Sequence, residues 1–169
     1  MSEIEKLKLT LEILRQEYER EYDRFKFLNS KAFNYFGLLS AAIAIYSSII
    51  LYIFKLSEVP LYIKILFLFT VFSFLLSLYY SLKAIRESSF TVIETYYKKE
   101  DALTGKKIIE QEYRDYLASI VLQLSESLEK NQKKNHLVTQ IDEKAMWWMR
   151  LGVVATFISF ALLSIFIGG

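Results

Sequence analysis

The stretch that decides the fold lies between Lys31 and Lys55 and reads AFNYFGLLSAAIAIYSSIILYIF over residues 32–54. It contains 23 residues and no Asp, Glu, Lys or Arg. A hydrocarbon core of about 30 Å needs roughly 20 helical residues. The stretch also lacks the alternation of a barrel strand, so its backbone amides must bond within a helix. Residues 32–54 are therefore predicted to form a transmembrane helix.

Two further stretches share this absence of charge. Residues 65–82 lie between Lys64 and Lys83, and residues 151–169 follow Arg150. Both are long enough to span a bilayer. Aromatic rings of the kind that settle at headgroup level stand near the ends of these stretches: Tyr62, Tyr79, Tyr80, Trp147 and Trp148. The sequence predicts an all-α membrane protein with three transmembrane helices and a helical cytoplasmic bundle.

Lysine and arginine are distributed unevenly along the chain. Residues 1–31 hold seven of them and residues 83–150 hold twelve, whereas the connection between the first two stretches holds only Lys55 and Lys64. The positive-inside rule places the Lys- and Arg-rich segments in the cytoplasm. We therefore expect a multi-pass protein of the inner, or plasma, membrane with a cytoplasmic N-terminus.

Helical periodicity extends beyond the three stretches. Apolar residues recur every three or four positions from Leu7 to Tyr35, residues 84–99 keep a helical mix, and EDALTG at 100–105 predicts a turn. A later helix leads through a polar run at 129–136 into the last stretch. The expected layout is a cytoplasmic arm 1–31, transmembrane helix 1 at 32–54, an external turn 55–64, transmembrane helix 2 at 65–83, a cytoplasmic helical region 84–149 and transmembrane helix 3 at 150–169.

No arrangement of residues predicts catalysis. His136 is the only histidine and the five glycines are scattered, which excludes a two-His metal site, a Ser-His-Asp triad and a phosphate-binding loop within one chain. We interpret the acidic neighbours Asp142 and Glu143 as a solvated helix face. A net charge of +2 gives no reason to expect nucleic acid as a partner. We expect no enzyme, no catalytic residue, no cofactor and no metal ion.

Small residues recur on one face of each predicted span. The rows are Gly37, Ala41, Ala44 and Ser48 in the first, Ser73, Ser77 and Ser81 in the second, and Gly152, Ala155 and Ser159 in the third. Such rows let helices pack closely, which is the first interpretation. The second is that Ser73, Ser77 and Ser81 line a hydrated pathway in a homo-oligomer.

Basic residues gather between the second and third stretches, at Lys98, Lys99, Lys106, Lys107, Arg114, Lys130, Lys133 and Lys134. Contact with anionic lipid is one interpretation. The other is the binding of a phosphorylated ligand by Arg114, Lys130, Lys133 and Lys134, with the rings of Tyr113 and Tyr116 beside Arg114 as a stacking surface.

Three short segments mark the approaches to the helices: DRFKFLNSKA at 23–32, the helix that begins YLASI at 116–120 and continues through Asn131 and Asn135, and KAMWW at 144–148. In this order they resemble small prokaryotic effectors of anti-phage signalling, the SLATT-type and the Pycsar-type transmembrane effectors. The resemblance implies assembly and permeabilisation of the inner membrane after a nucleotide signal. The chain departs from these families in having no recognisable nucleotide-binding motif, so the resemblance does not extend to a sensor role.

Two functions follow from these observations. The first is an oligomeric effector that permeabilises or depolarises the membrane in response to a cytoplasmic signal. The alternative is a non-conducting anchor or adaptor whose cytoplasmic helices dock a soluble partner protein. The expected partners are the lipid bilayer, further copies of the chain, and a cytoplasmic protein or nucleotide signal.

Overall fold

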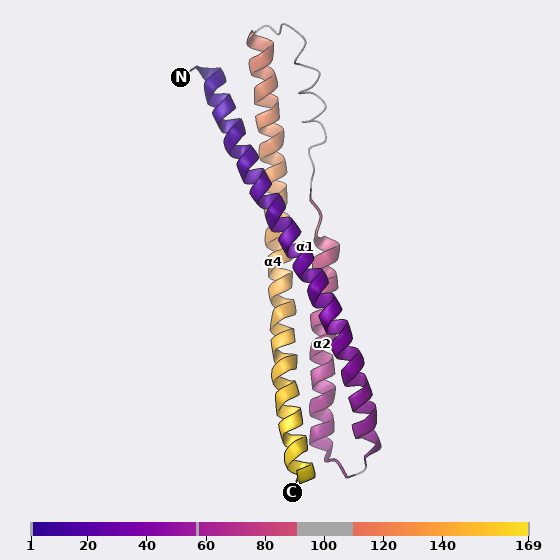
Figure 1. Cartoon of the computed structure of the whole chain (residues 1–169). Helices are drawn as coiled ribbons and strands as arrows, with labels where there is room; N and C mark the ends of the chain where they lie inside the picture. The colour runs from indigo at the N-terminus through magenta and orange to yellow at the C-terminus, as the bar shows by residue number, and fades with distance from the viewer. Residues whose placement is uncertain (1, 57, 91–109, 169) are drawn as a thin grey trace. The chain divides into compact units, whose positions relative to one another are not determined.

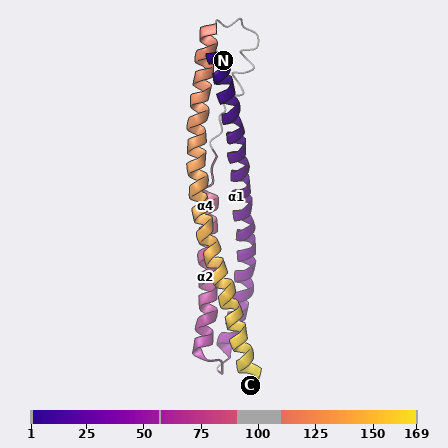
Figure 2. The ribbon, with the colours of Figure 1, turned by 90° about the vertical axis from the view of Figure 1, so that its left-hand side faces the viewer.

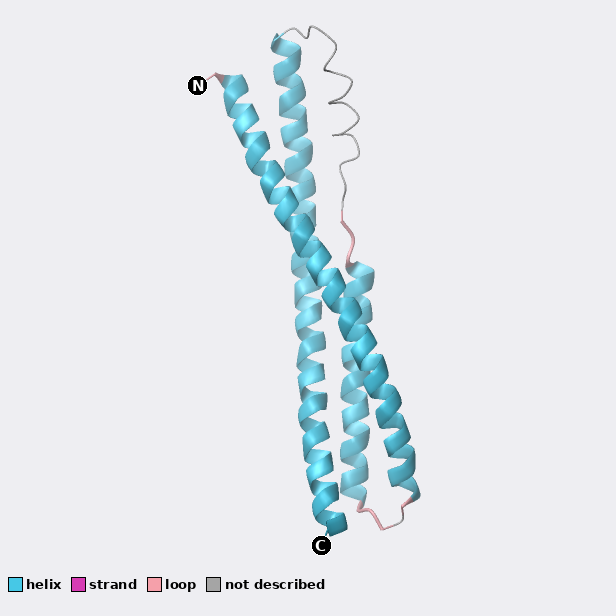
Figure 3. Ribbon diagram, viewed as in Figure 1, coloured by secondary structure: helices cyan, strands magenta, loops and turns pink. Residues whose placement is uncertain are grey.

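The computed structural model describes residues 2–56, 58–90 and 110–168 (Figure 1). Helix α1 spans Glu3–Lys55, α2 spans Leu61–Glu87 and α4 spans Glu110–Gly168. Within these described ranges there is no strand, as the colouring of Figure 3 shows. The prediction of an all-α protein is confirmed for this part of the chain.

Each of the three helices contains a segment that is long and apolar enough to cross a membrane. These segments coincide with the three charge-free stretches of the sequence. The chain is therefore compatible with a multi-pass membrane protein, as predicted.

The helix ends follow local signals in the sequence. The Ser2 backbone amide donates to Oε2 of Glu5 at 2.7 Å, and the Glu5 amide donates back to Oγ of Ser2 at 3.2 Å, which is a capping box at the start of α1. The α1–α2 connection holds Pro60, whose carbonyl accepts the amides of Ile63 and Lys64 in the first turn of α2.

The helical structure predicted for residues 84–99 is interrupted after the end of α2. We predicted helical structure through residues 84–99, but α2 ends at Glu87 and residues 88–90 are not helical. Two serines follow at 88 and 89, and serine competes for backbone hydrogen bonds and so favours helix ends. The remainder of this prediction, at 91–99, and the turn predicted at 100–105 lie outside the described residues.

The chain forms two compact units, which we call unit 1 and unit 2. Unit 1 comprises residues 1–27 and 88–137, and unit 2 comprises residues 28–87 and 138–169. All three charge-free stretches belong to unit 2. The compact unit that holds all three candidate membrane spans is thus separate from the unit that holds most of the charged segments.

Within unit 1, the described segments of α1 and α4 run in the same direction. Arg114 of α4 forms an ion pair with Glu3 of α1 at 3.2 Å, and Asn135 of α4 donates a hydrogen bond to Glu21 of α1. Residue numbers increase together along both helices, so the pairing is parallel. Phe90, beyond the end of α2, packs against the rings of Tyr18, Tyr22 and Phe25.

Unit 2 is built from segments of all three helices, which lie side by side in the views of Figures 1 and 2. Lys31 contacts Asp142, and Tyr46 contacts Phe160, so α1 and α4 run parallel here as well. Helix α2 is antiparallel to α4, because Ser77 contacts Ala145 whereas Phe67, earlier in α2, contacts Phe160, later in α4.

A heptad spacing on α1 supplies much of the core of unit 2. Ala32, Leu39, Tyr46 and Ile53 follow one another at intervals of seven residues and are all buried. A seven-residue interval returns to nearly the same side of a helix after two turns. Around Tyr46 lie the rings of three phenylalanines from α2 and α4, Phe67, Phe74 and Phe160, with ring centroids 5.6 to 6.5 Å from that of Tyr46.

Candidate functional site

A row of hydroxyl side chains runs along the buried face of α2. We call it the polar row; it consists of Thr70, Ser73, Ser77 and Ser81, each at most 1% exposed. Their spacing of three or four residues keeps them on one side of the helix. The structure thus brings Ser73, Ser77 and Ser81, predicted from the sequence, into the packed interior of unit 2, together with Thr70, which the sequence interpretation missed.

Three hydroxyls of the polar row form hydrogen bonds, in two different ways. Thr70 and Ser73 donate to the carbonyls of Leu66 and Phe69 one turn earlier. Ser77 instead donates across the helix interface to the carbonyl of Ala145 at 2.7 Å. This bond joins α2 directly to the backbone of α4.

Two buried hydroxyls of unit 2 lack a hydrogen-bond partner among the residues that the structure describes. They are Oγ of Ser81, at the end of the polar row, and the phenol oxygen of Tyr46, inside the aromatic core. A buried polar group without a partner costs about 1–3 kcal/mol. The interior of unit 2 therefore contains polar groups that gain energy from any hydration.

The small-residue rows of the other two helices face opposite environments. On α4, Gly152, Ala155 and Ser159 are buried, and a Cβ atom at Gly152 would lie 2.5 Å from Cε1 of Phe74. On α1, Gly37 has nothing within 4 Å of the position of a Cβ atom, and Ala41, Ala44 and Ser48 are exposed as well. We call these four residues the outer row of α1.

An ion pair stands where the first charge-free stretch begins. Nζ of Lys31 lies 2.5 Å from Oδ2 of Asp142, whose side chain is only 6% exposed, and also contacts the sulfur of Met146. Partial burial disfavours the ammonium, but the hydrogen bond and charge of Asp142, with a smaller contribution from Tyr35, outweigh it and raise the pKa of Lys31. Our interpretation of Asp142 as part of a solvated face is wrong, because α4 turns this residue toward α1.

Unit 1 also contains buried polar side chains that the sequence interpretation missed. Asn131 is fully buried, and Nδ2 of Asn135 donates to Oε2 of Glu21 at 2.7 Å and to the Glu21 carbonyl at 3.0 Å. Both lie in the run 129–136 that we described only as polar. Their spacing in the sequence could have predicted their burial, because they continue the buried series of Leu124 and Leu128 at intervals of three and four.

A polar residue in an otherwise apolar helix seam fixes the register of the two helices, because a shifted partner would leave it unsatisfied. The pairing of Asn135 with Glu21 has this consequence for α1 and α4 in unit 1. A shift of α4 along α1 would break both hydrogen bonds of Asn135 to Glu21.

The predicted phosphate ligands do not converge. Arg114 contacts Glu3 and Asp115, Lys133 pairs with Glu129 at 2.6 Å, and Lys134 bonds to Ser89. Lys130, Lys133 and Lys134 lie within about one turn of α4, whereas Arg114 is about 24 Å away along the same helix axis. Lys98, Lys99, Lys106 and Lys107 lie outside the described residues.

Within the described ranges, no group of three His, Asp or Glu side chains is arranged to hold a metal ion. Comparison with protein-family models, with curated proteins and with solved structures finds no match for this chain. The polar row, the outer row and the ion pair between Lys31 and Asp142 are the features of the described residues from which a function can be inferred.

Proposed function

We propose that the chain is an oligomeric membrane effector that permeabilises or depolarises the inner membrane in response to a cytoplasmic signal. The observation that carries this proposal is the polar row of α2, buried against α4, with the Ser81 hydroxyl unsatisfied. In a passive anchor these small side chains allow close packing, but the buried Ser81 hydroxyl without a described partner only costs stability. In a closed pathway all four hydroxyls have a use, because they replace water around an ion once the helices separate.

In the proposed mechanism, opening separates α2 from α4. The separation breaks the bond between Ser77 and the Ala145 carbonyl and exposes the hydroxyls of the polar row to water. Hydration of Ser81 and Tyr46 offsets part of the lost packing, since both hydroxyls lack a partner among the described residues of the closed state. The structure corresponds to the closed state in this proposal.

Assembly would use the outer row of α1. Small side chains let the backbones of two helices approach closely in lipid, where no hydrophobic force drives association. The hydroxyls of Ser40, Ser47 and Ser48, on or beside this row, already bond to carbonyls of their own helix. Contact with a second copy therefore leaves none of them unsatisfied.

The signal would act on residues of unit 1. Helices α1 and α4 each continue without a break from residues of unit 1 to residues of unit 2. A ligand or partner that changes the pairing of the cytoplasmic helices therefore alters two of the three spans. This orientation is part of the proposal and depends on the positive-inside distribution of Lys and Arg. Anti-phage defence is the context that the sequence resemblance implies.

The test is dye leakage from liposomes that contain only this chain. Leucine would not fit at Ser73, Ser77 and Ser81, so the informative variant is the triple change S73A/S77A/S81A, which removes three hydroxyls and little volume. Without the signal the closed state opens only transiently, so we expect slow leakage from the wild-type protein and far less from the triple variant at unchanged oligomer mass. The control S40A/S47A removes two exposed hydroxyls of α1 that do not belong to the outer row, and it should leak like the wild type.

A second function is favoured by a different observation. Outside the charge-free stretches, Leu9 and Ile13 of α1 and Leu122 of α4 are 49%, 50% and 61% exposed. Leu9 and Ile13 are four residues apart and form an apolar strip that suits the docking of a soluble partner protein. Assembled wild-type protein that leaves liposomes sealed would contradict the effector proposal and favour this adaptor.

A further inference from the structure

A half-open pocket of about 370 Å³ lies in unit 2, between α2 and α4. Its lining consists of Tyr80 from α2 and of Gln140, Glu143, Lys144, Trp147 and Trp148 from α4. The α4 residues recur at intervals of three and four, which places them along one side of the helix. The pocket lining includes no residue of the polar row and none of the four predicted phosphate ligands, Arg114, Lys130, Lys133 and Lys134.

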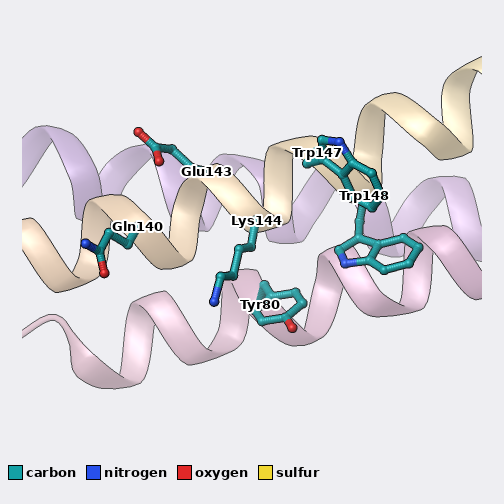
Figure 4. Close-up of a pocket in the computed structure, with 6 residues that line it drawn as sticks. All are labelled: Tyr80, Gln140, Glu143, Lys144, Trp147 and Trp148. Carbon is teal, nitrogen blue, oxygen red and sulfur yellow. The ribbon is translucent and has the colours of Figure 1, made fainter.

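The hydrogen-bond donors of the pocket lie on the side of α4 that faces α2. In Figure 4 the Lys144 side chain extends from α4 toward α2 and ends near the ring of Tyr80, with Gln140 and Trp148 on either side, while Glu143 and Trp147 point away. An ammonium, an amide, a phenol and an indole can each donate a hydrogen bond. One positive charge among several donors is the chemistry that holds a phosphate diester.

The position along the sequence determines where such a phosphate would come from. Tyr80 lies in the last turn of the charge-free stretch 65–82, and Trp147 and Trp148 stand just before the stretch 151–169. If the three helices cross the bilayer, the pocket lies at the level of the lipid headgroups, where Trp and Tyr are enriched. A phosphate in bulk solution has less access to this depth than a lipid headgroup.

We propose that this pocket binds the phosphate diester of a membrane phospholipid, with Lys144 as its cationic ligand and the faces of Tyr80 and Trp148 against the glycerol region. A lipid held there contacts both α2 and α4, the two helices that separate in the proposed opening. The inference depends on insertion of the helices into a membrane and not on permeabilisation.

The chain supplies its own reporter for this site. It contains two tryptophans, and both line the pocket. Phospholipid with brominated acyl chains, titrated into the full-length protein in a non-ionic detergent, quenches tryptophan emission when it binds nearby. Brominated diacylglycerol provides the same chains without the phosphate.

We expect brominated phosphatidylglycerol to quench at a mole fraction about fivefold lower than brominated diacylglycerol, the factor that one lysine–phosphate contact gives. The variant Lys144→Gln should remove this difference. The control Lys83→Gln changes an exposed lysine near the same end of α2 and should retain it.

Two results would overturn the proposal. Equal quenching by the two brominated lipids in the wild type would show that the phosphate is not recognised, and an unchanged difference in Lys144→Gln would show that Lys144 does not bind it. Competition by glycerol phosphate, which has no acyl chains, distinguishes a lipid phosphate from a soluble phosphate as the ligand. The proposal requires that it does not displace the brominated phospholipid at equal concentration, because displacement would identify a site for a soluble phosphate. Liposome leakage is a separate readout, so failure here leaves the proposed effector function standing.

Discussion

The two faces of α1 in unit 2 meet different surroundings. The inner face carries Lys31 and the heptad series from Ala32 to Ile53, which pack against α2 and α4. The outer face carries the outer row, where Gly37 meets nothing within 4 Å. The inner face holds one chain together, whereas the small side chains of the outer row, flanked by exposed large ones such as Leu38, leave space for a second helix. A row of small residues in the sequence therefore does not by itself show whether the row packs within one chain or is exposed on its surface.

The strongest way to break the inner face is to remove the cation from the buried ion pair. Lys31→Met leaves Asp142 buried without its partner, and we expect the free energy of unfolding to fall by about 3 kcal/mol. This value is at the low end of the range for breaking a buried ion pair, because the Lys31 side chain is still 27% exposed. Unfolding by sodium dodecyl sulfate in mixed micelles measures the loss.

The pH dependence identifies the charge as the cause. The pKa of Lys31 is raised in the folded state, so the contribution of the pair is complete below the ordinary lysine value of 10.5 and is lost as the pH rises through the raised value. The difference between wild type and Lys31→Met should therefore shrink only in strong alkali. Lys83→Met, at an exposed lysine, serves as the control, and an equal loss of stability in this control would contradict the assignment.

Two neighbouring leucines sharpen the contrast between the faces. Leu39 is 1% exposed and packs in the core of unit 2, whereas Leu38 is 62% exposed. In lipid the transfer of a leucine side chain between tails and protein gains little, so the cost of Leu39→Ala is mainly that of the cavity. We expect about 2 kcal/mol for Leu39→Ala and almost none for Leu38→Ala in the same unfolding assay. Similar losses would mean that the inner face is not packed as described.

The smallest effect on the fold is expected at the outer row. Gly37→Ile places a branched side chain where no atom of the chain is near, so the stability of the single chain should hardly change. The close approach of a second helix should be blocked, which would reduce the mass measured by light scattering in detergent to that of fewer copies. An unchanged oligomer would remove the outer row from the proposed assembly, and a monomeric wild type would remove assembly itself.

Much of the fold could be predicted because it follows from local chemistry. Charge-free stretches of 18 to 23 residues must bond their own backbone in lipid, and the apolar series from Leu7 to Tyr35 marks one side of α1. The site was harder to predict. Ser73, Ser77 and Ser81 were recognised as a row, but their burial, the bond from Ser77 to Ala145 and the partners of Asn135 and Asp142 require knowledge of the facing helix.

The sequence by itself determined which segments of this protein are helical and apolar enough to cross a membrane, because hydropathy and backbone satisfaction are properties of one segment at a time. Only the tertiary structure decided which small-residue rows are closed and which is open. Gly37 and Gly152 look alike in the sequence, and they differ because the Phe74 ring of α2 packs against Gly152 while no side chain of the chain reaches Gly37. Such a difference depends on contacts between residues far apart in the sequence, which no local pattern contains.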